Sequence, residues 1–190
     1  MRKLVVYTLT SLDGAVEDPR RYFQPVDANV PGPPSFDPDM DRLERALIDT
    51  QDAVVLGRRT YDEWSRYWPT SDEQPFADFI NGVRKYVVTS TPLEREWPGT
   101  EVVDGPPTDF VARLKQGAVG DIGVHGSITL ARSLIAAGLV DELQLAVGPV
   151  LDAEGPRLFE GLTGWQRLEL VDATSTSGGT VWLTYRPATG

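Results

Sequence analysis

The sequence predicts an α/β domain with a mostly parallel central sheet, flanking helices and a C-terminal antiparallel hairpin. Strand-length apolar runs alternate with helix-like segments from residue 4 to residue 147, a pattern typical of βαβ units. Two further strand-like segments then follow, joined by Ser177-Gly178-Gly179, which indicates a hairpin. A chain of 190 residues that is 41% hydrophobic is large enough for one well-packed core. We therefore expect a single domain over residues 1–190.

The N-terminal quarter predicts a strand, a turn, a long loop and a helix. Residues 4–9 are a strand, and Ser11-Leu12-Asp13-Gly14 is a turn. Residues 17–35 are rich in Pro, Gly, Asp and Asn. Loops of this length in compact domains often carry function, so we interpret it as an active-site loop, with a surface insertion as the alternative. Asp37-Pro38 then begins a helix whose apolar stripe is Met40, Leu43 and Leu47.

The remaining elements follow in regular alternation. Strands are expected over residues 53–56, 85–89, 101–103, 121–125, 142–147, 165–173 and 180–186. Helices are expected over residues 59–67 and 74–81, from a Thr108 cap to about Gly117, and from Gly126 through Ala137. Gly138 is a candidate C-cap for the last of these helices.

Composition excludes several classes of function. The net charge of -10 argues against nucleic-acid binding, which depends on cationic contacts to phosphate. No apolar run reaches the roughly 18 residues that a membrane span needs, and the N-terminus does not resemble a signal peptide. With no cysteine and one histidine, a metal site is not expected. We expect a cytoplasmic, metal-free protein.

The most informative stretch is Gly57-Arg58-Arg59-Thr60-Tyr61, which follows a buried strand and opens a helix. The first N–H groups of a helix lack internal partners, and the helix dipole adds positive potential there. Two arginines and a threonine hydroxyl can add hydrogen bonds to an anion. The alternative is that both arginines form surface salt bridges with Asp62 or Glu63.

Three strand ends share this character. The segments are residues 57–60, 89–91 and 126–129, each supplying glycine, small hydroxyl side chains or backbone donors. Ligands of open α/β sheets bind beyond the carboxyl ends of strands, so convergence of these segments would hold a pyrophosphate and a further phosphate. The pattern predicts a dinucleotide site, although the Gly-x-Gly-x-x-Gly fingerprint and the P-loop motif are both absent.

These residues resemble the dihydrofolate-reductase-like family, and within it the reductase domain of riboflavin biosynthesis, the RibD C-terminal-like branch. The matching pieces are Ser11–Gly14, Val55–Tyr61, Val88-Thr89-Ser90, and Gly126-Ser127 running on to Gly138-Leu139-Val140-Asp141-Glu142-Leu143. The resemblance covers nearly the whole chain in order, and its last piece is characteristic of the riboflavin-type branch. The zinc-deaminase signature of bifunctional riboflavin enzymes is absent, so the resemblance implies a reductase alone.

The resemblance implies NADPH as cofactor. Arg58 and Ser90 would contact the 2′-phosphate, and an arginine beside a hydroxyl suits that group better than a ribose diol. Arg59 and Thr60 would hold the pyrophosphate from one side. Gly126, Ser127 and Ile128 would close over it from the other. Thr8, Gly57, Thr89 and His125 complete the expected cofactor-binding set, and His125 has the alternative of a structural position at a strand end.

Reduction of an imine or pterin also needs a proton. Dihydrofolate reductases use one buried acid near the start of the helix that precedes the glycine-arginine motif. Counting back from Gly57 at the family's usual separation gives Asp41, whose alternative role is to stabilise the helix dipole. Asp13, in the turn after the first strand, is the other candidate proton donor, and its alternative role is to stabilise that turn.

The expected protein is an NADPH-dependent reductase of a small heterocycle. We rank the riboflavin-pathway substrate 5-amino-6-(5-phosphoribosylamino)uracil first, dihydrofolate second, and an unassigned imine or carbonyl third. Arg20 and Arg21 are candidates for a substrate phosphate. A homodimer is expected by resemblance, through an edge near residues 139–147. The alternatives are a non-catalytic nucleotide-binding module and a structural dimeric domain.

Overall fold

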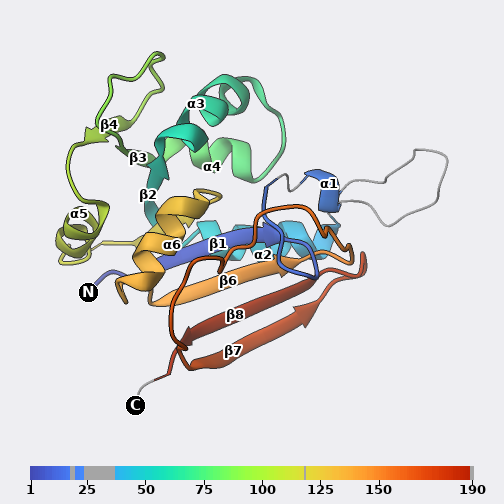
Figure 1. Cartoon of the computed structure of the whole chain (residues 1–190). Coiled ribbons are helices and arrows are strands. Elements are labelled where there is room, and N and C mark those ends of the chain that lie inside the picture. The colour runs from blue at the N-terminus through green and yellow to red at the C-terminus, as the bar shows by residue number, and fades with distance from the viewer. Residues whose placement is uncertain (18–19, 24–36, 118, 189–190) are drawn as a thin grey trace.

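The computed structural model describes residues 1–17, 20–23, 37–117 and 119–188, and its centre is one eight-stranded sheet (Figure 1). The strand order is β4-β3-β2-β5-β1-β6-β8-β7. The strands are β1 (Leu4–Thr10), β2 (Gln51–Gly57), β3 (Arg84–Val88), β4 (Thr100–Val103), β5 (Asp121–His125), β6 (Glu142–Val147), β7 (Leu168–Ser175) and β8 (Val181–Pro187). The helices are α1 (Arg20–Phe23), α2 (Pro38–Ile48), α3 (Arg58–Tyr67), α4 (Phe76–Gly82), α5 (Pro107–Leu114) and α6 (Ile128–Ala136), with a 3₁₀ turn at Trp68–Thr70.

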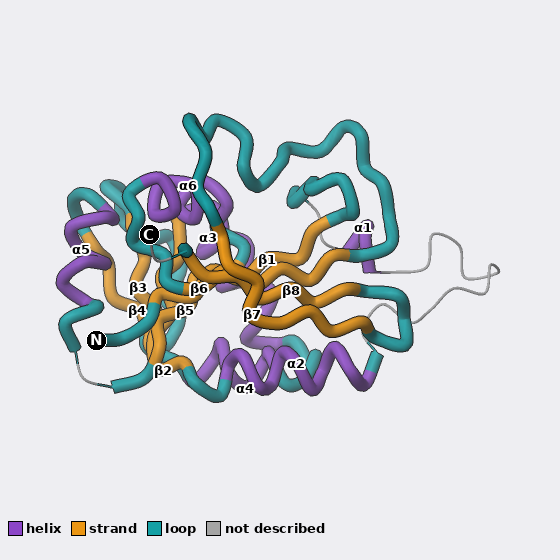
Figure 2. Tube along the Cα trace, turned by 90° about the horizontal axis from the view of Figure 1, so that it is seen from below, coloured by secondary structure: helices purple, strands orange, loops and turns teal. Residues whose placement is uncertain are grey.

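The predicted fold class is confirmed. The strands from β4 to β6 in the sheet order pair in parallel, whereas β8 and β7 pair antiparallel at one end. Figure 2 shows α2 and α4 on one side of the sheet and α6 on the other. Because both faces are covered there, the inner strands β1, β2 and β5 are mostly buried on both sides, as parallel strands usually are.

Strand β1 divides the core into two layers. Val5 and Tyr7 point into the cluster formed with α2, α3 and α4. Leu4 and Val6 point into the cluster formed with α5 and α6. These four side chains are at most 4% exposed, because alternate residues of a strand face opposite sides of the sheet.

Two expected boundaries were wrong. Helix α5 begins at Pro107 with Pro106 as its N-cap residue, so Thr108 lies inside the helix and does not cap it. Proline suits the first helical position because its φ angle is already helical and its missing N–H would be unpaired there. The strand expected from residue 165 begins at Leu168, and the Trp165 side chain is 88% exposed.

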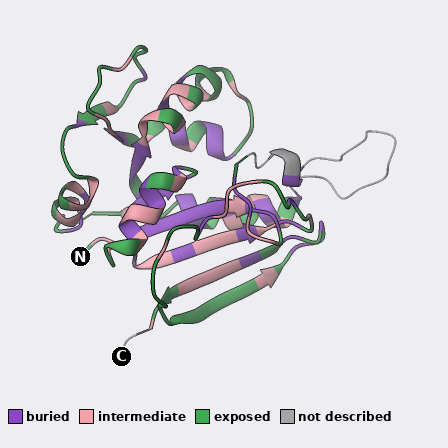
Figure 3. Ribbon diagram, viewed as in Figure 1, coloured by how far each residue is buried: buried purple, intermediate pink, exposed green. Residues whose placement is uncertain are grey.

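The segment near residues 139–147, expected at an edge, does not form a free edge of the sheet. Strand β6 pairs with β1 on one side and β8 on the other, so its backbone groups are already used within the sheet. The edge strand at this end is β7, which is exposed along most of its length (Figure 3). Leu170 and Val171 of β7 are each 51% exposed.

Most of the long loop expected over residues 17–35 lies outside the described residues. Within it, α1 is described, and its Tyr22 and Phe23 are buried. The Tyr22 hydroxyl donates to Asp152 at 3.1 Å, which ties this end of the segment to the loop after β6. The expected active-site role of the loop and the side chains of Arg20 and Arg21 fall outside what the structure describes. In the part of the chain that the structure describes, no helix combines the length and apolar character needed to cross a membrane.

Candidate active site

The three predicted strand ends lie at one edge of the sheet. Strands β3, β2 and β5 are neighbours and parallel, so their carboxyl ends meet there. The Gly57 amide donates to the Ser127 hydroxyl at 3.0 Å, which joins the segment after β2 to the segment after β5. A Cβ atom on Gly57 would lie 3.8 Å from Ser127 Cβ, so the two turns are in contact.

Two helices begin at this edge, and neither is capped by a side chain. Gly57 is the N-cap residue of α3 and Ser127 is that of α6, and neither makes a side-chain capping hydrogen bond. The Ile128 amide already donates to the Gly126 carbonyl at 3.0 Å, so the amides that remain for a ligand are the later ones in the first turn of α6 and those in the first turn of α3. Together with the two helix dipoles they form a cradle suited to a pyrophosphate. Thr60 and Ile128, both half-buried, lie in the first turns of these helices.

Arg58 is held between its own helix and the loop after β3. Its Nε donates to Asp62 at 2.7 Å, and its Nη1 donates to the Thr91 hydroxyl at 2.6 Å. Within the described residues, Nη2 makes no hydrogen bond and could reach a phosphate. In the same loop, the Thr89 hydroxyl accepts a bond from the Thr91 amide at 3.1 Å, and Ser90 is exposed. The structure thus brings Arg58 to Thr91 and Pro92, in the loop that follows Thr89 and Ser90.

Arg59 is in a weaker position. It lies 3.5 Å from Glu63, and the two side chains are 78% and 64% exposed. Exposed pairs of this kind contribute little to stability, so Arg59 can leave Glu63 for an anion at small cost. Both arginines are nevertheless paired with acids, as the alternative of a structural domain predicted.

Thr8 supplies an unpaired buried hydroxyl near this edge. The residue is 3% exposed, and its Oγ1 has no hydrogen-bond partner among the described residues. Tyr7 pairs with His125, so Thr8 stands beside Gly126. Gly126 has a φ of +66°, and a Cβ atom there would lie 3.4 Å from the Trp64 ring. An orphaned hydroxyl next to open backbone fits a bound polar ligand.

His125 does not face the cofactor edge. It is 2% exposed, its Nε2 lies 2.7 Å from Gln51 Oε1, and its ring contacts Phe76 at 5.3 Å between centroids. Burial lowers its pKa to about 3, so the ring is neutral at physiological pH. The side chain belongs to the core layer under α2 and α4, which agrees with the structural alternative.

Asp13 has a structural environment. Its carboxylate accepts from the Asp152 amide at 2.9 Å, from Ser11 Oγ at 2.7 Å and from Arg157 Nη2 at 2.9 Å. These hydrogen bonds, led by that of the Asp152 amide, lower the pKa of Asp13. An acid whose ionised form is stabilised in this way is a poor proton donor near neutral pH.

Asp41 lies in the first turn of α2 and is half-buried, but the acid that points into the core is Glu44, one turn further along. Glu44 is 6% exposed. Burial raises its pKa to about 7, and the negative charges of Asp41 and Glu73 add to this effect. Glu44 was not among the residues predicted from the sequence, although its position in the helix could have indicated it. It stands four residues after Met40 and three before Leu47, on the same apolar face of the helix.

Tyr7 of β1 points into the core layer that β1 shares with α2. It is 4% exposed, and its ring stacks on Trp182 at 4.9 Å between centroids. Burial raises its pKa well above the usual value, and the charge of Glu44 adds to this. The Tyr7 hydroxyl has no hydrogen-bond partner among the described residues.

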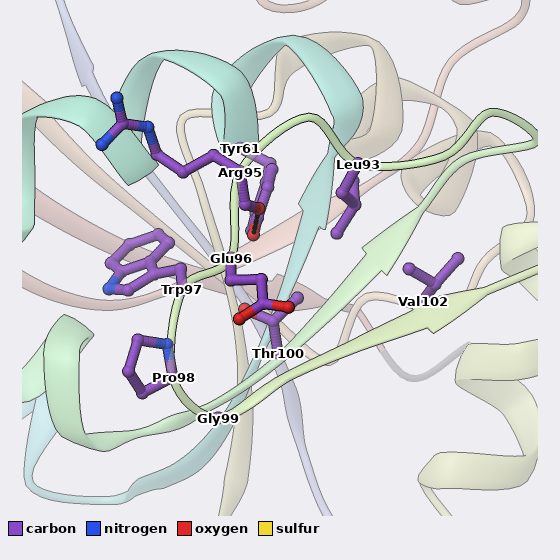
Figure 4. Close-up of a pocket in the computed structure, with 9 residues that line it drawn as sticks. All are labelled: Tyr61, Leu93, Arg95, Glu96, Trp97, Pro98, Gly99, Thr100 and Val102. Carbon is purple, nitrogen blue, oxygen red and sulfur yellow. Dashed lines mark hydrogen bonds between the residues drawn. The ribbon is translucent and has the colours of Figure 1, made fainter.

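A cavity of about 410 Å³ lies elsewhere, between α3 and the outer strand β4 (Figure 4). It is lined by Tyr61, Leu93, Arg95, Glu96, Trp97, Pro98, Gly99, Thr100 and Val102. None of the expected site residues lines it. Within the described residues, no cluster of three or more His, Asp or Glu side chains could hold a metal ion.

The chain is similar in sequence to known proteins. The model of the family described as "RibD C-terminal domain" matches residues 2–182. The uncharacterized protein YyaP of Bacillus subtilis (strain 168) is 27% identical over 188 residues, which are 97% of this chain and 94% of that protein.

Two solved structures are similar to this chain in fold. One is a diaminohydroxyphosphoribosylaminopyrimidine deaminase/5-amino-6-(5-phosphoribosylamino)uracil reductase of Thermotoga maritima, with a TM-score of 0.66, 13% identity, and coverage of 98% of this chain but 57% of that one. The other is the dihydrofolate reductase of Enterococcus faecalis complexed with NADP(H), with a TM-score of 0.62, 16% identity, and coverage of 98% and 97%. The match of the family model over almost the whole chain shows that this protein belongs to the RibD C-terminal domain family.

Proposed function

We propose that this protein is an NADPH-dependent reductase of a small heterocycle and that Glu44 is its proton donor. The observation that carries the proposal is the contact of Gly57 with Ser127, which joins two uncapped helix N-termini at the carboxyl edge of the sheet. Family membership and the NADP(H) bound by a reductase of similar fold support it.

The residues at the edge fit a dinucleotide phosphate. The amides in the first turn of α3 and those after Ile128 in the first turn of α6, with Ser127 and Thr60, would hold the pyrophosphate. Arg58, Thr89 and Ser90 would hold the 2′-phosphate, because Arg58 already reaches the loop that carries both hydroxyls. Thr8 Oγ1, a buried hydroxyl without a partner among the described residues, would bond the bound cofactor.

The proposed chemistry is reduction of one C=N bond. NADPH supplies a hydride to carbon when bound, and the protein supplies the proton that nitrogen takes up. Glu44 suits this step because a carboxyl with a pKa of about 7 is partly protonated at neutral pH. Asp41 contributes indirectly, since its charge helps to raise the pKa of Glu44. Asp13 is already occupied as a hydrogen-bond acceptor.

The substrate belongs to the ribosylaminopyrimidine or pterin class in this proposal. The first candidate is 5-amino-6-(5-phosphoribosylamino)uracil, because of family membership, and the second is dihydrofolate, because of the similar fold. We also propose a homodimer in the cytoplasm. The exposed strand β7 offers an edge for such a dimer, in place of the internal strand β6.

Calorimetric titration with NADPH tests the cofactor assignment. We expect Arg58→Ala to weaken NADPH binding by about 10- to 100-fold, because charge-assisted hydrogen bonds to phosphate contribute about 1.5–3 kcal/mol. NADH should bind much more weakly than NADPH and be insensitive to the substitution. Arg113→Ala, at an exposed arginine on α5, is the matched control. Equal binding of NADPH by both variants and the wild type would contradict the proposal.

A non-catalytic nucleotide-binding module is the second candidate, favoured by Asp13, which is already occupied as an acceptor from the Asp152 amide and from Arg157. A measurement of turnover distinguishes the reductase from the binding module. Oxidation of NADPH followed at its absorbance maximum, with either candidate substrate present, supports the reductase if Glu44→Gln abolishes it. Tight NADPH binding without turnover of either substrate supports the binding module.

A further inference from the structure

The hairpin of β7 and β8 has one polar face and one apolar face. On the side of α2, Glu169 forms an ion pair with Arg186 at 2.8 Å, and the Thr174 hydroxyl donates to Asp172 at 2.8 Å. The opposite face, on the side of α6, contains no Asp, Glu, Lys, Arg or His. We name it the outer face, and its members on β6, β8 and β7 are Leu145, Val147, Val181, Leu183, Tyr185, Leu168, Leu170 and Ala173.

The packing over the outer face runs out towards β7. Val6, Leu143, Tyr185 and Leu170 stand in one row across the four strands β1, β6, β8 and β7. Val6 and Leu143 pack with α6 and are 0% and 5% exposed, Tyr185 is half-buried, and Leu170 is 51% exposed. Among the described residues, no helix lies over β7 and β8 on this side (Figure 1). An apolar sheet face normally packs against a second layer, so this one lacks its partner.

The loop that joins β6 to β7 enlarges the apolar surface. It rises on the same side of the sheet as α6 (Figure 2), and it exposes Leu151, Phe159 and Trp165 at 73%, 47% and 88%. With the three most exposed side chains of the outer face, these residues present on the order of 600 Å² of apolar surface. A stable dimer buries about 800 Å² on each partner, so this surface supplies most of what a dimer needs.

A second copy of this chain is the occupant that fits the outer face. With a net charge of -10, two copies repel each other wherever acidic residues meet. The outer face has no acidic residue, and two copies of an apolar surface match about a two-fold axis without any matching of charges. A cationic partner would gain nothing from a face without acids.

We propose that two copies of this protein dimerise by packing their outer faces against each other, sheet on sheet. The inference rests on the homodimer of the proposed function and deepens it by naming the surface. It needs neither the cofactor nor the substrate of that proposal.

Sedimentation velocity over a range of protein concentrations tests the surface. We expect the wild type to be a dimer and Leu170→Asp to raise the dissociation constant at least about a hundredfold, because the two-fold axis buries the new carboxylate twice. Val102→Asp is the matched control, since Val102 is 50% exposed on β4 at the opposite edge of the sheet, and should leave the dissociation constant unchanged. A monomeric wild type, or a Leu170→Asp variant that dimerises as tightly as the wild type, would overturn the proposal.

Spin labels locate the contact without a charge in the interface. The chain has no cysteine, so Ala173→Cys and Val102→Cys each take a single label. The distance between the two copies of the label should be short and narrowly distributed at position 173, on the outer face, and clearly longer at position 102. Equal distances, or the reverse order, would refute the assignment of the surface. Neither measurement uses NADPH, so a protein that dimerises in this way but fails to bind NADPH would refute the reductase alone.

Discussion

Replacing Glu44 by glutamine should remove one large contribution to the pH dependence of stability between pH 5 and pH 8. The carboxyl ionises near its usual 4.5 in the unfolded chain and near 7 in the folded protein. Between these values the unfolded chain binds fewer protons than the native state, so rising pH stabilises the unfolded chain. The stabilising contribution is complete below pH 4.5 and is lost as pH rises through 7.

The size of this effect follows from the two pKa values. Each pKa unit is worth about 1.4 kcal/mol, so the change from 4.5 to about 7 corresponds to about 3 kcal/mol. Of this, about 2 to 3 kcal/mol is lost between pH 5 and pH 8, because the unfolded chain is already mostly ionised at pH 5. The carboxyl is 6% exposed, so little of the effect is screened by solvent.

Urea denaturation followed by tryptophan fluorescence measures this directly. Between pH 5 and pH 8 the free energy of unfolding of the wild type should fall by about 2 to 3 kcal/mol relative to that of Glu44→Gln. His125, whose pKa burial lowers to about 3, adds a slope of opposite sign that both proteins share, so the comparison is made on the difference between them. Glu96→Gln, the same change at an exposed position, should behave as the wild type does. If Glu44→Gln keeps the slope of the wild type, Glu44 titrates normally and the argument for it as proton donor fails.

Three further changes test the packing around the site. Lys85→Met should lower the free energy of unfolding by about 2 to 4 kcal/mol in urea denaturation. The buried ammonium donates to two backbone carbonyls at the end of α4, each at 2.8 Å, and the substitution leaves both without a partner. An unchanged denaturation midpoint would contradict this. Gly123→Ala should lower the melting temperature strongly, since its Cβ would lie 2.6 Å from His125 Nε2 and closer still to Gln51. Gly82→Ala, at a position with open space around it, is the control and should leave the melting temperature nearly unchanged. Equal melting temperatures of the two variants would show that His125 and Gln51 can move aside. Asp13→Asn should lower the melting temperature at neutral pH, and the difference from wild type should shrink as pH falls below the lowered pKa of Asp13; a difference that is constant with pH would argue against the ion pair with Arg157.

The order of the elements was predictable because it depends on local patterns. Apolar runs of strand length, the Asp37-Pro38 helix start and the glycine turns are each set by the nearest few residues. Asp37 does cap α2, with its side chain accepting from the Met40 amide at 2.9 Å. The cofactor edge was also within reach, because parallel strands place their carboxyl ends together whatever their exact order.

Some parts of the site depend on which residues meet across the sheet, and the sequence alone could not supply them. The pairing of β6 with β8 decides that residues 142–147 are internal, and that pairing is made with a strand 34 or more residues away. The single histidine, on β5, faces the core because it pairs with Gln51 of β2 and packs against Tyr7 of β1, the two strands next to it.

The sequence by itself determined the fold class of this protein and the edge of the sheet at which the candidate site lies, because periodicity, glycine and helix starts are local properties. Only the tertiary structure decided that Glu44 is buried in the core, where burial raises its pKa to about 7. That burial requires α2 to pack against one particular face of the sheet, and the charge of Glu73 on another segment adds to the effect. Burial of this kind depends on which distant segments pack together, so the residues next to Glu44 in the sequence do not determine it.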